Sequence, residues 1–113
     1  MPHNKDSIII EKILREIGDI ESDIEGFSRE SFLQDGKTKR AVAMSLINIG
    51  ELANHFSVDF KNEQASIPFA KIKGLRNIAA HGYHTLNFSF IWLTVTESVP
   101  ELKKQLLNYQ KMR

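Results

Sequence analysis

Apolar residues recur every three or four positions along the first half of the chain, the spacing of helices that bury one face. Ser7 is a candidate N-cap for the first of these helices, and Asp35 with Gly36 starts the second. The apolar rows are Ile10, Ile13, Ile17, Ile20, Ile24 and Phe27, and then Val42, Leu46, Ile49, Ala53 and Phe56. Matching rows predict two long helices that pack antiparallel, joined through Gly26 and a short helical turn over residues 28–33.

Gly50 lies inside the second predicted helix, where a glycine costs about 1 kcal/mol relative to alanine. We therefore expect another backbone to approach the helix closely at this position. Glu51 follows it directly. The pattern leaves open whether Glu51 is merely solvated or faces a functional site.

A third helix is predicted to begin at Pro68, after a polar, aperiodic stretch over residues 57–67 that is typical of a loop. Gly82 is a natural stop for this helix directly after His81. Its expected buried row is Phe69, Ile72, Leu75 and Ala79.

Asn87 is a candidate cap for a fourth helix. Because its apolar rhythm continues through Pro100, a kink is favoured, although Ser98 and Glu101 also fit a capping box that would restart the helix. The row is Phe88, Trp92, Val95, Val99, Leu102, Leu106 and Tyr109. The run over residues 88–95 is also rich in β-forming residues, but no other stretch offers it a partner strand, so we reject a strand there.

The four rows predict a single all-α domain over residues 1–113, an antiparallel, up-and-down bundle of four to five helices with a kinked or broken last helix. Phe90, Ile91 and Leu93 lie off the main row of the fourth helix. A monomer would expose this apolar surplus, so we expect a homodimer that pairs through the fourth helix.

Composition removes several classes of function. With 15 basic and 14 acidic residues the net charge is +1, so any contact with RNA must come from local clusters. The absence of cysteine excludes disulfides, thiolate metal sites and cysteine nucleophiles, and fits a reducing interior. The polar start of the chain matches neither a signal peptide nor a membrane span, so we expect a soluble, cytoplasmic protein that does not contact membranes.

The candidate chemistry is concentrated in residues 74–84, where Arg76, Asn77, His81 and Tyr83 lie close together in sequence. Lys71 and Lys73 precede them and are candidate RNA-binding residues. An arginine and a histidine are the groups needed to handle a phosphodiester without a metal, because one is always charged and the other can carry a proton near neutral pH.

Arg76 and His81 are not simple neighbours on an ideal helix, since five positions leave them about 140° apart and about 7.5 Å along the axis. They can converge on one phosphate if the helix ends near Ala80, if the arginine side chain wraps around, or if a second copy completes the site. Such a pair near a helix end also occurs commonly as plain surface contacts. His81 and His84 have the spacing of a metal pair, but with no third ligand we expect neither a metal nor a cofactor.

Residues 76–83 resemble the Arg-x4-His-x-Tyr signature of the HepT-like HEPN proteins, the toxins of HEPN/minimal-nucleotidyltransferase toxin–antitoxin pairs. The resemblance extends to residues 40–54, which are similar to the second helix of the family, and to Ile67 and Pro68 before the motif. Residues 92–102 are similar to the last helix, so the likeness covers residues 35–106.

This resemblance implies a HEPN-like bundle, a symmetric homodimer with both motifs facing a shared cleft, and metal-independent cleavage of RNA. Arg76 and His81 are then the catalytic pair, with Asn77 as a polar helper. Glu51 is a further candidate for a supporting role, from its place beside Gly50. Tyr83 matches the tyrosine that the antitoxin, a minimal nucleotidyltransferase, silences by AMPylation. His84 departs from the pattern, because relatives often carry an aromatic residue there.

Two alternatives stay open. The first is a non-catalytic helical interaction protein that binds a nucleotidyltransferase partner and is modified by it. The second is a small-nucleotide-binding module that uses the same basic residues.

Overall fold

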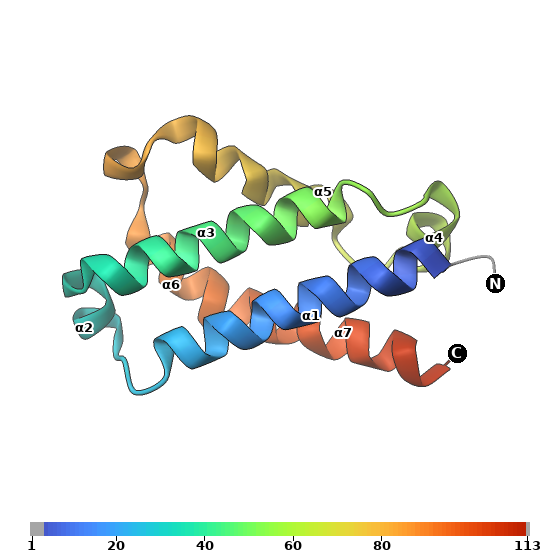
Figure 1. Ribbon diagram of the computed structural model, residues 1–113, viewed down its shortest axis with the longest axis horizontal. Helices are drawn as coiled ribbons and strands as arrows, with labels where there is room; N and C mark the ends of the chain where they lie inside the picture. Colours follow the sequence, from blue (N-terminus) through green and yellow to red (C-terminus); the bar gives the residue numbers. More distant parts are fainter. Residues whose placement is uncertain (1–3, 113) are drawn as a thin grey trace.

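Four helical arms run alternately up and down in the computed structural model (Figure 1). It describes residues 4–112, apart from the side chains of residues 4, 79–81 and 83. The described residues contain no strand, so the all-α prediction is confirmed, as is the rejection of a strand over residues 88–95. The arms are α1 (Asn4–Ile24), α3 (Gly36–Ala53), α5 (Phe69–Lys73) with the 3₁₀ helix η1 (Gly74–His81), and α6 (Phe88–Leu93) with α7 (Val99–Met112).

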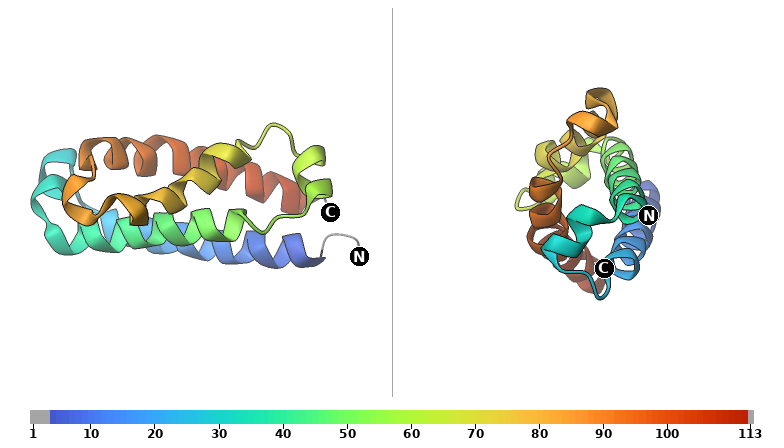
Figure 2. Two further views of the ribbon diagram at one scale, coloured as in Figure 1. Left: turned by 90° about the horizontal axis from the view of Figure 1, so that it is seen from above. Right: turned by 90° about the vertical axis from the view of Figure 1, so that its left-hand side faces the viewer.

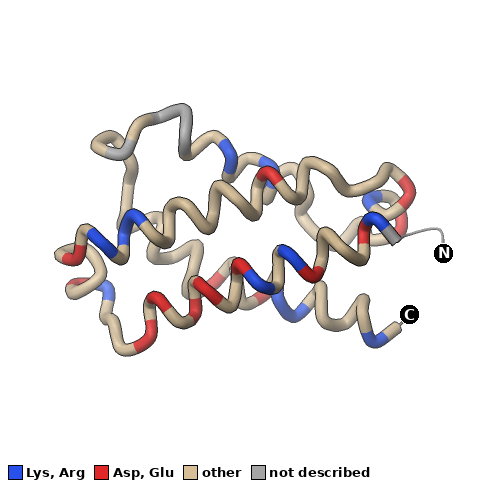
Figure 3. Tube along the Cα trace, in the orientation of Figure 1, with Lys and Arg blue, Asp and Glu red and all other residues tan. Residues whose placement is uncertain are grey.

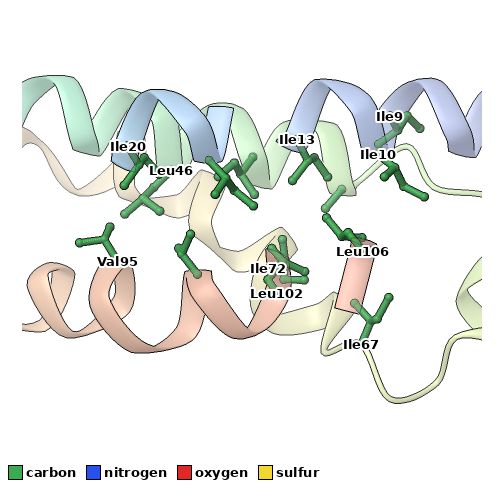
Figure 4. Close-up of a cluster of buried hydrophobic side chains, with 14 of the residues drawn as sticks. Ile9, Ile10, Ile13, Ile20, Leu46, Ile67, Ile72, Val95, Leu102 and Leu106 are labelled. Carbon is green, nitrogen blue, oxygen red and sulfur yellow. The ribbon is translucent and has the colours of Figure 1, made fainter. Parts of the chain in front are cut away.

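The predicted seam between α1 and α3 forms the centre of the core (Figure 4). The members of both rows that are sealed from solvent are Ile10, Ile13, Ile17, Ile20, Val42, Leu46, Ile49 and Ala53. Asp35 caps α3 as expected, since its carboxylate accepts the N–H of Thr38 at 2.9 Å. Two boundaries were predicted wrongly: α1 is already helical at Asn4, with Ser7 buried inside it, and α3 ends before Phe56.

Two short helices close opposite ends of the bundle. The expected turn after Gly26 is α2 (Arg29–Gln34), capped by Ser28. The stretch expected to be a loop contains α4 (Val58–Glu63), so that prediction was wrong.

The cap of α4 is tied to the first turn of α1. Ser57 accepts the N–H of Phe60 at 3.1 Å and donates its own N–H and hydroxyl to the buried carboxylate of Asp6, at 2.8 and 2.6 Å. The sequence signal that was overlooked is Ser57, a typical N-cap residue, with the apolar Phe60 three positions later.

The last arm stays helical through Pro100, as its apolar rhythm predicted. Asn87 caps α6 by accepting the N–H of Phe90 at 3.1 Å. The irregularity is a π-helical turn, η3 (Thr94–Ser98), where the N–H of Val99 donates to the carbonyl of Thr94. Pro100 has no N–H to donate to the helix, and the π-helical turn before it accommodates this irregularity. The apolar row therefore stays on one face of the arm, and the helix does not restart at Ser98.

The arms follow each other around the bundle so that η1 packs on α3 and α7 packs on α1. The views in Figure 2 show the four arms side by side, with the short 3₁₀ helix η2 (Tyr83–Thr85) at the end where η1 turns into α6. Acidic residues are strung along α1 (Figure 3). Among the described residues, no helix has both the length and the apolar character that a membrane crossing requires.

The apolar surplus on α6 is smaller than its sequence predicted. Ile91 is buried in the core. Phe90 and Leu93 remain outside, 64% and 49% exposed.

Candidate functional site

The arm that carries the candidate residues is not a continuous α-helix. It starts after Pro68 as expected, but it tightens at Gly74 into the 3₁₀ helix η1. Gly82 ends this helix as predicted, with a positive φ of 73° that a glycine adopts without strain. The backbone that presents the motif is therefore narrower and more extended than an α-helix.

Gly50 is the point at which this arm docks on α3. A β-carbon at Gly50 would lie 2.5 Å from the backbone nitrogen of Arg76, 3.1 Å from the carbonyl oxygen of Ile72 and 3.1 Å from the carbonyl carbon of Leu75. The predicted close approach of a second backbone is confirmed. The backbone it admits is that of Arg76 itself.

Glu51, the next residue of α3, lies beside the Arg76 side chain. Its Oε2 is 3.7 Å from the Nε of Arg76, and the two side chains are 54% and 36% exposed. The distance exceeds that of a hydrogen bond, so the contact is an ion pair through one edge of the guanidinium. Of the two possibilities left open for Glu51, the structure favours orientation toward the motif.

The side chains of His81 and Tyr83 lie outside the described residues. The backbone between positions 76 and 81 is described, and it is 3₁₀. Five residues of such a helix turn by about 600°, which leaves the two positions about 120° apart and about 10 Å along the axis. Compared with an α-helix, the structure therefore separates the candidate pair further along its axis within one copy.

A groove of about 880 Å³ opens between α5 with η1 on one side and α6, η3 and α7 on the other. Lys71 and Asn77 lie on the first side and Glu97 on the second, around an apolar floor that includes Ile72 and Leu102. Phe90 and Leu93 also line it. Lys73 is exposed on the same arm as Lys71.

Sequence reasoning missed this groove, because its shape depends on how two helical arms pack in space and not on the pattern within either arm. The sequence sign of the groove was the surplus of apolar residues on α6, because Phe90, Ile91 and Leu93 line it.

Comparison with known proteins places the chain in a family. Residues 13–108 match the sequence model of the family described as "Ribonuclease HepT-like". A protein of Caldanaerobacter subterraneus named a putative RNase is 33% identical over 97 residues, 86% of this chain and 87% of its own length. The "probable ribonuclease HepT" of Thermococcus cleftensis is 35% identical over 94 residues, 80% of this chain and 83% of its own.

A protein of Methanocaldococcus jannaschii, also named a putative RNase, is 31% identical over 106 residues, 94% of this chain and 88% of its own. No solved structure matches the chain significantly. The likeness drawn from residues 76–83 and their flanking segments is confirmed, and the chain belongs to the ribonuclease HepT-like family.

Proposed function

We propose that this protein is a metal-independent endoribonuclease toxin of a toxin–antitoxin system, with Arg76 and His81 as its catalytic pair. Membership of a ribonuclease family supports the reaction class. The observation that carries the proposal is the placement of Arg76: its backbone is docked on Gly50, yet its side chain is one-third exposed. A cation that is held in place and still accessible is what binding of an RNA phosphate requires.

The proposed reaction uses the 2′-hydroxyl of RNA as the nucleophile. A base removes the 2′-hydroxyl proton, the 2′-oxygen bonds to phosphorus, and the bond from phosphorus to the 5′-oxygen breaks as an acid protonates that oxygen. The products are a 2′,3′-cyclic phosphate and a 5′-hydroxyl end. His81 moves the proton and Arg76 stabilises the charge on the phosphorane, while Asn77, Lys71 and Lys73 are supporting groups on the same arm.

A homodimer completes this site. One copy supplies a single imidazole, and an ideal 3₁₀ helix places positions 76 and 81 about 10 Å apart along its axis. A twofold pairing supplies two imidazoles and two guanidinium groups to one cleft. The exposed Phe90 and Leu93 provide apolar surface for such a pairing.

Regulation by a nucleotidyltransferase antitoxin is the remaining part of the proposal. Tyr83 is the candidate for AMPylation, on the strength of the sequence signature. Each added phosphate would bring negative charge to a site that must accept a phosphate of RNA.

The decisive experiment measures cleavage of RNA in EDTA by purified protein free of its partner. Arg76→Ala and His81→Ala are each expected to lower the rate by about 10²-fold or more. Arg15→Ala and His55→Ala are matched controls, because these side chains of the same types are exposed on α1 and in the turn after α3, and they should cleave like the wild type.

Equal residual cleavage by the wild type and both site variants would overturn the enzyme proposal. The exposed apolar pair on α6 would then favour the second candidate, a non-catalytic helical protein that binds a nucleotidyltransferase partner.

A further inference from the structure

Two consecutive residues of α3 contact Arg76 in different ways. Gly50 admits its backbone nitrogen to within 2.5 Å of where a β-carbon would stand. Glu51 places a carboxylate oxygen 3.7 Å from its Nε. Gly50 therefore fixes the position of the Arg76 backbone, and Glu51 lies beside its charged side-chain end.

The ion pair is poorly suited to a purely stabilising role. Both side chains are more than one-third exposed, and ion pairs in such positions contribute little to folding, because water screens them. Arginine has a long side chain with many rotamers, so a neighbouring carboxylate changes which of them are populated. The effect to expect from Glu51 is on the position of the guanidinium.

The edge of the guanidinium that Glu51 occupies matters for binding. A carboxylate beside Nε leaves the two terminal nitrogens at the far end of the fork, and a phosphate can accept two parallel hydrogen bonds from them. Glu51 also lowers the positive potential at Arg76, so it should not strengthen the binding of RNA. It should instead favour the geometry in which bound RNA reacts.

We propose that Glu51 is a positioning residue that holds Arg76 by its Nε edge and presents the terminal nitrogens to the scissile phosphate. The proposal rests on the ribonuclease function proposed above. Removal of the carboxylate should lower kcat and leave KM for RNA nearly unchanged, because the loss falls on orientation.

The kinetic test uses the full chain with Glu51→Gln, Glu51→Asp and the control Glu11→Gln, an exposed glutamate of α1. We expect Glu51→Gln to lower kcat about tenfold, with KM within about twofold of the wild type and an unchanged melting temperature. Glu51→Asp should lie between Glu51→Gln and the wild type, and Glu11→Gln should match the wild type. A wild-type kcat in Glu51→Gln would overturn the proposal.

A double variant separates positioning from an independent role. Lysine has no Nε edge and no planar fork, so in an Arg76→Lys background the Glu51→Gln change should cost no further activity. A full additional tenfold loss there, or a shifted pH–rate profile, would mean that Glu51 acts on RNA directly and not through Arg76.

A measurement without RNA distinguishes failure of this proposal from failure of the ribonuclease assignment. The Nε–H signal of Arg76 in ¹⁵N NMR should report greater mobility in Glu51→Gln than in the wild type. Unchanged mobility overturns the positioning role whether or not RNA is cleaved. Increased mobility in a protein that cleaves no RNA would support the positioning of Arg76 by Glu51 and overturn the ribonuclease assignment.

Discussion

The half of the bundle formed by α1 and α3 is regular, whereas the half formed by η1 and by α6 with α7 is not. Uninterrupted α-helix runs through Asn4–Ile24 and Gly36–Ala53. Across from them, Gly74–His81 is 3₁₀ and Thr94–Ser98 is π-helical. The candidate site is borne by the irregular half and held by the regular one.

The contrast shows where the local pattern determines the backbone and where neighbours do. In α1 and α3 the apolar spacing, the caps and helical propensity all favour the same structure. In η1 the hydrogen-bond geometry is less favourable than in an α-helix, and its backbone touches α3 at a glycine. Departures from local preference of this kind are expected at functional sites.

Truncation of the regular seam should give the largest loss of stability. Ile17 is fully buried, so Ile17→Ala should lower the free energy of unfolding by about 2–5 kcal/mol, through lost burial and the cavity left behind. Urea denaturation measures it. Ile8→Ala, an exposed position on the same helix, should change it by less than about 0.5 kcal/mol.

The same variant tests whether scaffold and site are separable. Below the unfolding transition, Ile17→Ala should cleave RNA at the wild-type rate per folded molecule. A rate that drops in step with stability would show that the regular half also shapes the site.

Paired glycine variants probe the junction between the halves. Gly50→Ala places a β-carbon against the backbone of Arg76, so it should cost about 1–3 kcal/mol of stability and displace η1. At Gly18, inside α1, a β-carbon meets nothing within 4 Å, and Gly18→Ala should stabilise by about 0.5–1 kcal/mol. Thermal unfolding of both proteins measures these opposite signs.

Cleavage assays on the glycine pair complete the test. Gly50→Ala should lose activity beyond its loss of folded protein, because Arg76 moves, and Gly18→Ala should keep it. Stabilisation by Gly50→Ala would mean that η1 does not need the glycine to dock.

The fold could be predicted from sequence because its main signals are local. Asp35 and Asn87 as caps, Gly82 as a stop and the buried rows of α1, α3 and α7 were found where expected, apart from Phe56, which follows the end of α3. The short helix α4 was missed, since six residues are too few to show a period, and its cap depends partly on Asp6 near the N-terminus.

Less of the site was predictable, for the same physical reason. Gly50 predicted a close backbone contact, but only the three-dimensional structure identifies Arg76 as the residue in contact. The switch of η1 to 3₁₀ geometry has no sequence signature, because its residues are equally compatible with an α-helix. The groove depends on how far two arms diverge, which no single stretch encodes.

The smallest expected effect concerns pH and the start of α3 in the regular half. The N–H of Thr38, followed by its side chain, lowers the pKa of Asp35 from its ordinary value of 3.8. A carboxyl whose pKa is depressed by folding stabilises the protein above its unfolded pKa, and this contribution is lost as the pH falls through the folded pKa. Asp35→Asn keeps an oxygen acceptor for the cap but removes the charge.

We therefore expect the wild type to exceed Asp35→Asn slightly in melting temperature at neutral pH, and the gap to close as the pH drops below 3.8. Thermal melts followed by circular dichroism across this range measure the gap. Two curves that stay parallel into acid would show that hydrogen bonding alone, and not the ionised carboxylate, starts α3. The start of α3 would then depend on the apolar seam with α1 and on hydrogen bonds from an uncharged cap.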